Sequence, residues 1–206
     1  MAGDLLVEAG AALSVDGCRY PIATGPGRGA NGSPAAGGSH AGRGANAGAT
    51  ASGPTYGSPV FPVDLGSGGG RSGLSFSNGG GVLRLDVAGE IRVGGRVSAR
   101  GDSARTITPT YSPGGAEGGS IRVNAGVISG SGAIDASGGP GWNGGGGGGR
   151  VTVESLCWNG FSLSQIRVAG GAGGTKGAEP GSIHPDFQVG IAAGPIATSG
   201  ALRVRS

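Results

Sequence analysis

Three stretches of the chain share one plan, in which a pair of glycines leads into a strand-like segment, a turn of small residues and a second short strand. The copies span residues 80–101, 118–139 and 148–171. Apolar and polar side chains alternate within each copy, which is the period of a β-strand that buries one face. Because no apolar stripe with the period of a helix occurs, the sequence predicts an all-β fold.

Repeats of this length bury too little apolar surface to be stable alone, so we expect the copies to stack on one another. Stacked coils pair their strands about 4.8 Å apart, in a short parallel β-helix, or solenoid, of about four or five coils. Residues 5–17 have the pattern of an opening coil and residues 181–187 that of a closing one. Aligning the copies places Leu83, Ile121 and Val151 in one inward-facing column.

Glycine accounts for 52 of the 206 residues, and residues 144–149 are all glycine. An ordered glycine costs roughly 0.5–1 kcal/mol relative to alanine, so order at such sites needs compensation from packing. The glycine-rich excursions are therefore either floppy loops or segments that turn sharply and pack closely, some of them as polyproline II-like strands. We expect one domain, residues 1–206, in which residues 22–66 form a long glycine-rich insertion and residues 185–206 a C-terminal tail without the repeat.

The charges of the chain indicate few partners. The net charge is +3 and is carried mostly by scattered arginines, without the basic patch and aromatic platforms of a nucleic-acid binder. No stretch reaches the roughly 18 apolar residues of a membrane span. The N-terminal segment lacks the basic start of a signal peptide and alternates like a strand. We therefore expect neither nucleic acid as a partner nor a membrane span.

The cysteines and histidines give little support for a chemical site. Cys18 and Cys157 are either two free thiols or the partners of one disulfide that closes a long loop. His40 and His184 each lack a second histidine or cysteine at the spacing of metal ligands. The sequence alone therefore predicts no metal centre.

Four segments carry a resemblance to a known group of proteins: "SVDGCRYPIATGPGRGANGS", "YGSPVFPVDLGSGGG", "GGSIRVNAGVISGSGAIDASGG" and "GGGGGGRVTV". They resemble the glycine-rich right-handed parallel β-helix segments, of pectin-lyase-like fold, in large secreted or cell-surface proteins. The resemblance covers most of residues 5–175 and implies a right-handed β-helix and an extracellular or cell-surface location. Enzymes of this fold hold calcium-binding carboxylates and a basic residue on adjacent coils, so the resemblance leaves calcium open as a cofactor.

Stacking places equivalent outward side chains in two neighbouring columns. The first column holds Asp86, Asn124 and Glu154, and the second holds Arg84, Arg122 and Thr152. Two coils would separate the backbones of Asp86 and Glu154 by about 10 Å, which suits a pair of carboxylates acting as acid and base in an inverting glycosidase. The competing interpretation is a solvated face of mixed charges, in which each ion pair contributes about 0–1 kcal/mol.

Four aromatic residues fall in or beside the excursions: Trp142, Trp158, Tyr56 and Tyr111. Exposed aromatic rings there would stack on sugar rings, which makes these residues candidates for glycan binding. The alternative is local, since an aromatic ring can also cover glycine-rich backbone and close the end of a thin core. The sequence does not decide between these two roles.

The function predicted from the sequence is a structural or adhesive scaffold, extracellular or on the cell surface, rather than an enzyme. No amphipathic capping helix is evident, so an open strand edge would be exposed unless it is covered or joined to another subunit. This favours end-to-end self-association, as in a fibre, or assembly with other subunits of a larger surface structure. The alternatives are a glycan-binding adhesin module and a polysaccharide lyase or hydrolase of the pectin-lyase-like fold.

Overall fold

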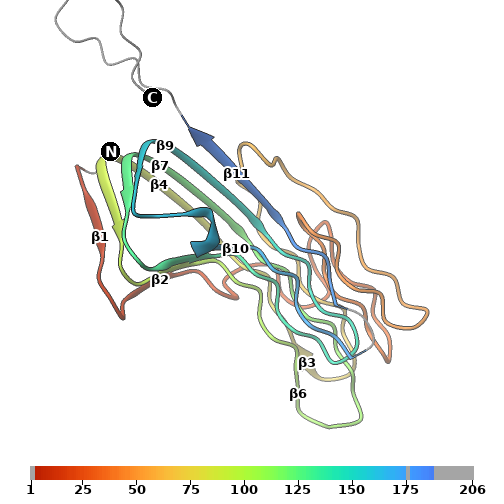
Figure 1. The fold of residues 1–206 in the computed structure, drawn as a ribbon. Coiled ribbons are helices and arrows are strands. Elements are labelled where there is room, and N and C mark those ends of the chain that lie inside the picture. Colours follow the sequence, from red (N-terminus) through yellow and green to blue (C-terminus); the bar gives the residue numbers. More distant parts are fainter. Residues whose placement is uncertain (1–2, 175–176, 188–206) are drawn as a thin grey trace, which may run out of the picture.

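The computed structural model describes residues 3–174 and 177–187, and β-strands carry the fold (Figure 1). A five-stranded parallel sheet contains, in spatial order, β1 (Leu5–Val7), β4 (Val82–Val93), β7 (Ser120–Ser129), β9 (Arg150–Asn159) and β11 (Ser182–Phe187). A four-stranded parallel sheet contains β10 (Ile166–Arg167), β8 (Ala133–Asp135), β5 (Arg96–Ser98) and β2 (Ala12–Ser14). The rest comprises the antiparallel pair β3 (Ser75–Phe76) and β6 (Arg105–Thr106) and the 3₁₀-helix η1 (Leu163–Gln165). The prediction of an all-β fold is confirmed.

Each sequence repeat contributes one strand to each parallel sheet. β4 is followed by β5, β7 by β8 and β9 by β10, and β1 and β2 form the same pair in residues 5–17. The inward column is in the predicted register, because Leu83 pairs with Ile121 and Ile121 with Val151. Residues 182–187 pair with β9, so the strand continues three residues into the predicted C-terminal tail. Residues 188–206 of that tail lie outside the described part of the chain.

A thin aliphatic core fills the space between the two sheets. Its largest fully buried members come from the alternating positions of the repeats: Ile91, Val93, Val97, Ile121, Val123, Ile128, Ile134, Val151 and Val153. Burying a valine or isoleucine side chain contributes about 1.5–3 kcal/mol, so every added repeat stabilises its neighbours. Among the described residues, no helix is long and apolar enough to cross a membrane.

The glycine-rich segments pack into an ordered bundle beyond one end of the sheets. Residues 114–119 show the arrangement, because their backbone N–H groups donate in turn to three different neighbouring segments. The pairs are Gly114 to Gly70 and Glu117 to Ser67, Gly115 to Gly144 and Gly118 to Gly147, and Ala116 to Asp102 and Gly119 to Ala99. Every third residue thus returns to the same neighbour, whereas a β-strand would alternate. Three residues per turn without internal hydrogen bonds is the geometry of polyproline II.

Glycine is required in this bundle because the backbones touch. A Cβ atom added to Gly114 would overlap the carbonyl of Ala36, and one added to Gly37 would overlap the carbonyl of Gly145. The first part of the long insertion is therefore built into the bundle. This is the close packing expected under the second interpretation of the glycine-rich excursions, and the floppy-loop interpretation is wrong for these residues.

Candidate functional site on the five-stranded sheet

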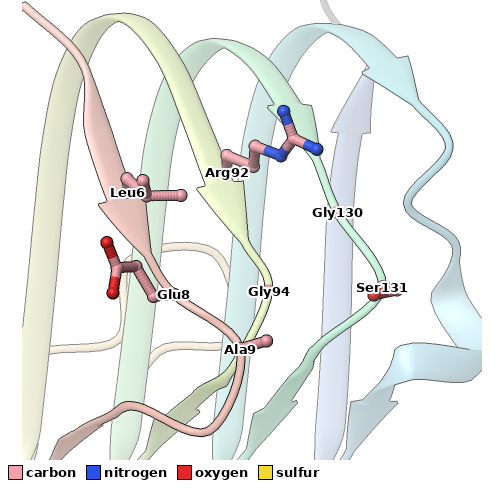
Figure 2. Close-up of a pocket in the computed structure, with 7 residues that line it drawn as sticks. All are labelled: Leu6, Glu8, Ala9, Arg92, Gly94, Gly130 and Ser131. Carbon is pink, nitrogen blue, oxygen red and sulfur yellow. The ribbon is translucent and has the colours of Figure 1, made fainter.

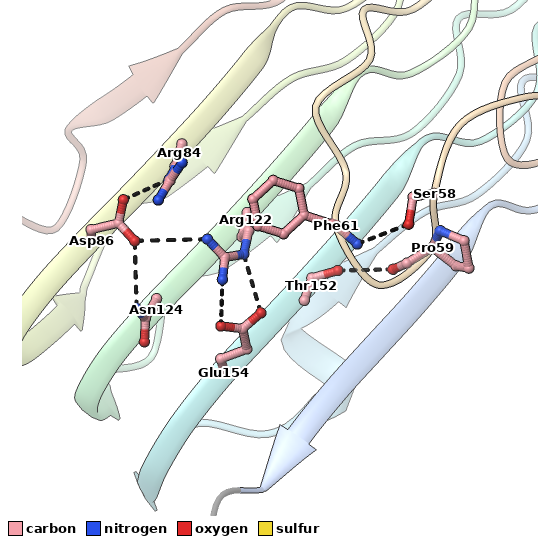
Figure 3. Close-up of polar contacts among 9 residues, drawn as sticks. All are labelled: Ser58, Pro59, Phe61, Arg84, Asp86, Arg122, Asn124, Thr152 and Glu154. Atoms are coloured by element: carbon pink, nitrogen blue, oxygen red, sulfur yellow. Dashed lines mark hydrogen bonds and ion pairs between the residues drawn. The ribbon is translucent and has the colours of Figure 1, made fainter.

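The two predicted columns of polar side chains exist on the outer face of the five-stranded sheet (Figure 3). Asp86 pairs in register with Asn124, and Asn124 with Glu154. In the neighbouring column, Arg84 pairs with Arg122 and Arg122 with Thr152. The sequence therefore predicted correctly which side chains stand side by side.

Arg122 lies at the centre of this charged ladder. Its Nε lies 3.1 Å from Glu154 Oε1 and its Nη2 lies 2.6 Å from Glu154 Oε2, a bidentate pair. Its Nη1 lies 3.8 Å from Asp86 Oδ1, and the opposite oxygen of Asp86 accepts a 2.6 Å hydrogen bond from Arg84 Nε. The Arg122 guanidinium also stands over the ring of Phe61, 4.5 Å from its centroid. Such forked, stacked contacts are typical of an arginine with a fixed orientation.

The outer face is not solvated as expected, because part of the long insertion lies across it. Arg122 and Thr152 are buried. Thr152 Oγ1 donates to the carbonyl of Pro59 at 3.0 Å, and Ser120 Oγ donates to that of Asp64 at 2.6 Å. Residues 58–64 therefore form a cover over the ladder, a long-range contact that the repeat pattern does not predict.

The geometry of the ladder does not suit acid–base catalysis. The hydrogen bond from Arg84 holds the pKa of Asp86 below its ordinary value, so this carboxyl is poorly suited to donate a proton. Glu154 has both oxygens bound to Arg122. Neither carboxylate is left to act on a substrate, and the competing interpretation, an ionic ladder, fits the arrangement better.

We expect Arg122→Met to lower the free energy of unfolding by about 2 kcal/mol, because it leaves the half-buried Glu154 without its partner. Arg84→Met is the matched control, since Arg84 is exposed and its ion pair contributes less than about 1 kcal/mol. Urea unfolding of Arg122→Met, of Glu154→Gln and of the double variant gives the coupling energy between the two residues, with Arg84→Met measured alongside. Cleavage of a polysaccharide by the wild type that disappears in Glu154→Gln would contradict the structural role.

The four aromatic candidates divide into two pairs. Tyr56 is half-buried with its hydroxyl inside the molecule, and the ring of Trp158 lies 6.1 Å from that of Phe161 against the core. Trp142 and Tyr111 are exposed among the glycine-rich segments. Glycan binding therefore remains a prediction for Trp142 and Tyr111, whereas Tyr56 and Trp158 take the local, packing role.

The two cysteines are free and exposed, so the disulfide alternative is wrong. Cys18 follows β2, in the strand pair of residues 5–17, whereas Cys157 lies in β9, three strand spacings along the stack. That separation is about 14 Å, and the Cα atoms of a disulfide lie within about 7 Å of one another.

A buried polar cluster, which the sequence analysis missed, fastens the insertion to the bundle. The Tyr56 hydroxyl donates to Glu117 Oε1 at 2.8 Å, and the backbone N–H of Ser67 donates to the same oxygen. The ring of His40 stacks on that of Tyr56, with centroids 4.7 Å apart. Arg150 donates to the carbonyl of Tyr56 through Nη2 at 2.5 Å. His40 and Glu117 each stand among glycines, in GGSHAG and GGAEGG, which is the one sequence signal of their burial.

Burial decides the protonation of this cluster. It raises the pKa of Glu117 well above its ordinary value, and it lowers the pKa of His40 to about 4. His40 Nδ1 lies 3.0 Å from the carbonyl of Gly118, which only accepts, so the neutral ring carries its proton on Nδ1. Nε2 of His40 and Oε2 of Glu117 are buried without a hydrogen-bond partner. His40 is therefore neutral at pH 7, and burial shifts Glu117 towards its protonated form.

Two hollows of the surface lie beside the strand pair of residues 5–17, which we call the first repeat. One, of about 360 Å³, is lined by Leu6, Glu8, Ala9, Arg92, Gly94, Gly130 and Ser131 (Figure 2). A second, of about 370 Å³, is lined by residues 5–8 and 11–13. Over residues 3–174 and 177–187, no group of three His, Cys, Asp or Glu side chains is placed to hold a metal ion. Calcium binding therefore stays a prediction.

Comparisons with protein-family models, curated proteins and solved structures found no match to this chain.

Proposed function

We propose that the protein is a structural and adhesive scaffold, extracellular or on a cell surface, built as a short right-handed parallel β-helix that joins further coils end to end. The observation that carries this proposal is the pair of open strand edges. Within the described residues, β1 pairs only with β4 and β2 only with β5. Both parallel sheets therefore end, on the same side of the molecule, in strands with unpaired backbone groups.

The first edge also has apolar surface and space for an incoming coil. Leu6 of β1 is 58% exposed and lines both hollows of the first repeat. Figure 2 shows it in the first of them. An exposed edge of this kind favours pairing with another strand. In the proposed scaffold, a further coil packs on this surface.

The other end of the five-stranded sheet offers a matching edge. β11 is the outermost strand there and runs parallel to β1, so β11 of one molecule can extend the sheet of the next by adding to its β1. Head-to-tail contacts of this type do not close on themselves and generate filaments. The rigid glycine bundle would then project at each molecule along such a filament.

We expect concentration-dependent filaments in electron micrographs and a rising mass in sedimentation experiments. Leu6→Asp places a charge on the exposed edge strand and should abolish assembly. Leu156→Asp is the matched control, because Leu156 lies in β9 inside the sheet and is also 58% exposed. A monodisperse monomer at high concentration, or equal loss of assembly in both variants, would contradict end-to-end joining.

A further inference from the structure

The two-stranded ribbon formed by β3 and β6 presents one apolar face to solvent. Phe76 pairs with Arg105 and Ser75 with Thr106. Side chains alternate along each strand, and Ser75 is buried, so Phe76 and Arg105 face outward. Figure 1 shows this ribbon past the glycine-rich segments, away from β1 and β11.

Leu74 and Ile107 extend the outward face of the ribbon. The backbone N–H of Ile107 donates to the carbonyl of Leu74 at 3.3 Å, which places the two residues next to each other beyond the pair Ser75–Thr106. Leu74 and Ile107 are each 66% exposed and Phe76 is 57% exposed. Large apolar side chains clustered in this way mark an interaction surface, whereas single exposed ones do not.

Two amphipathic aromatic residues border this face. A Cβ atom on Gly73 would overlap the ring of Tyr111, so the ring lies against the backbone beside Leu74. The backbone N–H of Trp142 donates to the carbonyl of Pro113 at 3.1 Å, so the backbone of this exposed tryptophan lies next to the segment that carries Tyr111. We name the exposed apolar face of Leu74, Phe76 and Ile107, together with Tyr111 and Trp142 on the neighbouring segments, the ribbon patch.

The charge around the ribbon patch is positive. Residues 71–77 and 103–113 contain Arg71 and Arg105, both exposed, and no aspartate or glutamate. The acid next in sequence, Asp102, accepts a 3.4 Å hydrogen bond from the backbone N–H of Asn78. The patch therefore combines exposed apolar side chains with two exposed arginines.

We propose that the ribbon patch docks on the surface of a membrane that contains anionic lipids. Leu74, Phe76 and Ile107 would enter the boundary between headgroups and acyl chains, where apolar side chains are favoured. Tyr111 and Trp142 suit the headgroup level because their rings are amphipathic. The two arginines match the negative surface. A glycan would set its hydroxyls against the aliphatic side chains, so the patch fits lipid better than sugar.

This inference rests on the adhesive part of the proposed function and supplies its partner. The test is co-sedimentation with vesicles of phosphatidylcholine, with and without phosphatidylglycerol. We expect binding to the mixed vesicles that weakens as salt rises. Leu74→Ser combined with Ile107→Ser should reduce the binding roughly tenfold or more, because it removes most of the inserting apolar surface. Arg71→Gln with Arg105→Gln should remove the preference for anionic lipid.

The matched control is Leu156→Ser combined with Leu163→Ser, which changes two exposed leucines elsewhere and should leave vesicle binding unchanged. Circular dichroism checks that each variant keeps the fold. No binding to mixed vesicles, equal loss in the control, or retention on an acidic polysaccharide that depends on the same ribbon residues would overturn the membrane proposal. Filament formation is measured on the same samples. Filaments without vesicle binding refute this inference alone, and vesicle binding without filaments refutes end-to-end assembly alone.

Discussion

Replacing Gly114 with alanine should lower the free energy of unfolding by more than about 3 kcal/mol. The added Cβ would overlap the carbonyl group of Ala36 and approach the backbone nitrogen of Gly37. Backbone atoms cannot rotate away as the end of a side chain can, so segments of the bundle must separate. For a chain of this size, each kcal/mol lowers the melting temperature by about 2–4 °C. Thermal unfolding followed by circular dichroism measures the loss.

Gly177→Ala is the control for this experiment. Nothing lies within 4 Å of the Cβ position at Gly177, so the same change in chain entropy occurs without a clash. A neutral effect or a small gain of stability is expected there. Equal stability of the two variants would show that the bundle is loosely packed. The glycine-rich segments would then be flexible loops.

The sheets could be predicted from the sequence because the order of apolar and polar side chains reflects the strands. Alternation along a strand fixes which face is buried, and the glycine pairs align the copies, so the pairing of Leu83 with Ile121 followed directly. The glycine bundle has no comparable pattern, because glycine has no side chain. Its order resides in backbone hydrogen bonds with a three-residue period, and a glycine run such as residues 144–149 looks the same whether it packs or moves.

The candidate site was predicted in part for the same reason. The column of Asp86, Asn124 and Glu154 follows from repeat alignment, but the role of its carboxylates depends on what covers them. That cover comes from the long insertion, which places Phe61 over Arg122. Its path is fixed by contacts distant in sequence, and no local pattern encodes them.

The ribbon patch shows where composition misleads. Composition points to tryptophans and tyrosines as the glycan-binding residues, because their rings stack on sugars. The most exposed large apolar side chains of the ribbon patch are instead Leu74 and Ile107, which the repeat pattern does not include. Their exposure follows from the pairing of a two-stranded ribbon that has no further layer over its outer face.

The stability of the protein should fall as the pH drops from about 6.5 to about 4, through His40. Burial lowers the pKa of His40 to about 4. Between pH 4 and 6.5 the imidazole is therefore protonated in the unfolded chain and neutral in the folded chain. The contribution is complete above the unfolded pKa and is lost as the pH falls through the folded one. At neutral pH this contribution of His40 to the free energy of unfolding is about 3 kcal/mol.

Glu117 acts in the opposite direction and has to be separated from His40. Its raised pKa keeps a proton on the folded chain, so its contribution is present at low pH and is lost as the pH rises. The measurement is therefore made on Glu117→Gln, which retains the oxygen that accepts from Tyr56, by urea unfolding at several pH values. The slope between pH 4 and 6.5 should vanish when His40→Gln is added. A slope that survives in the double variant would assign the acid sensitivity to carboxylates elsewhere, and the junction between insertion and bundle would then not depend on a neutral His40.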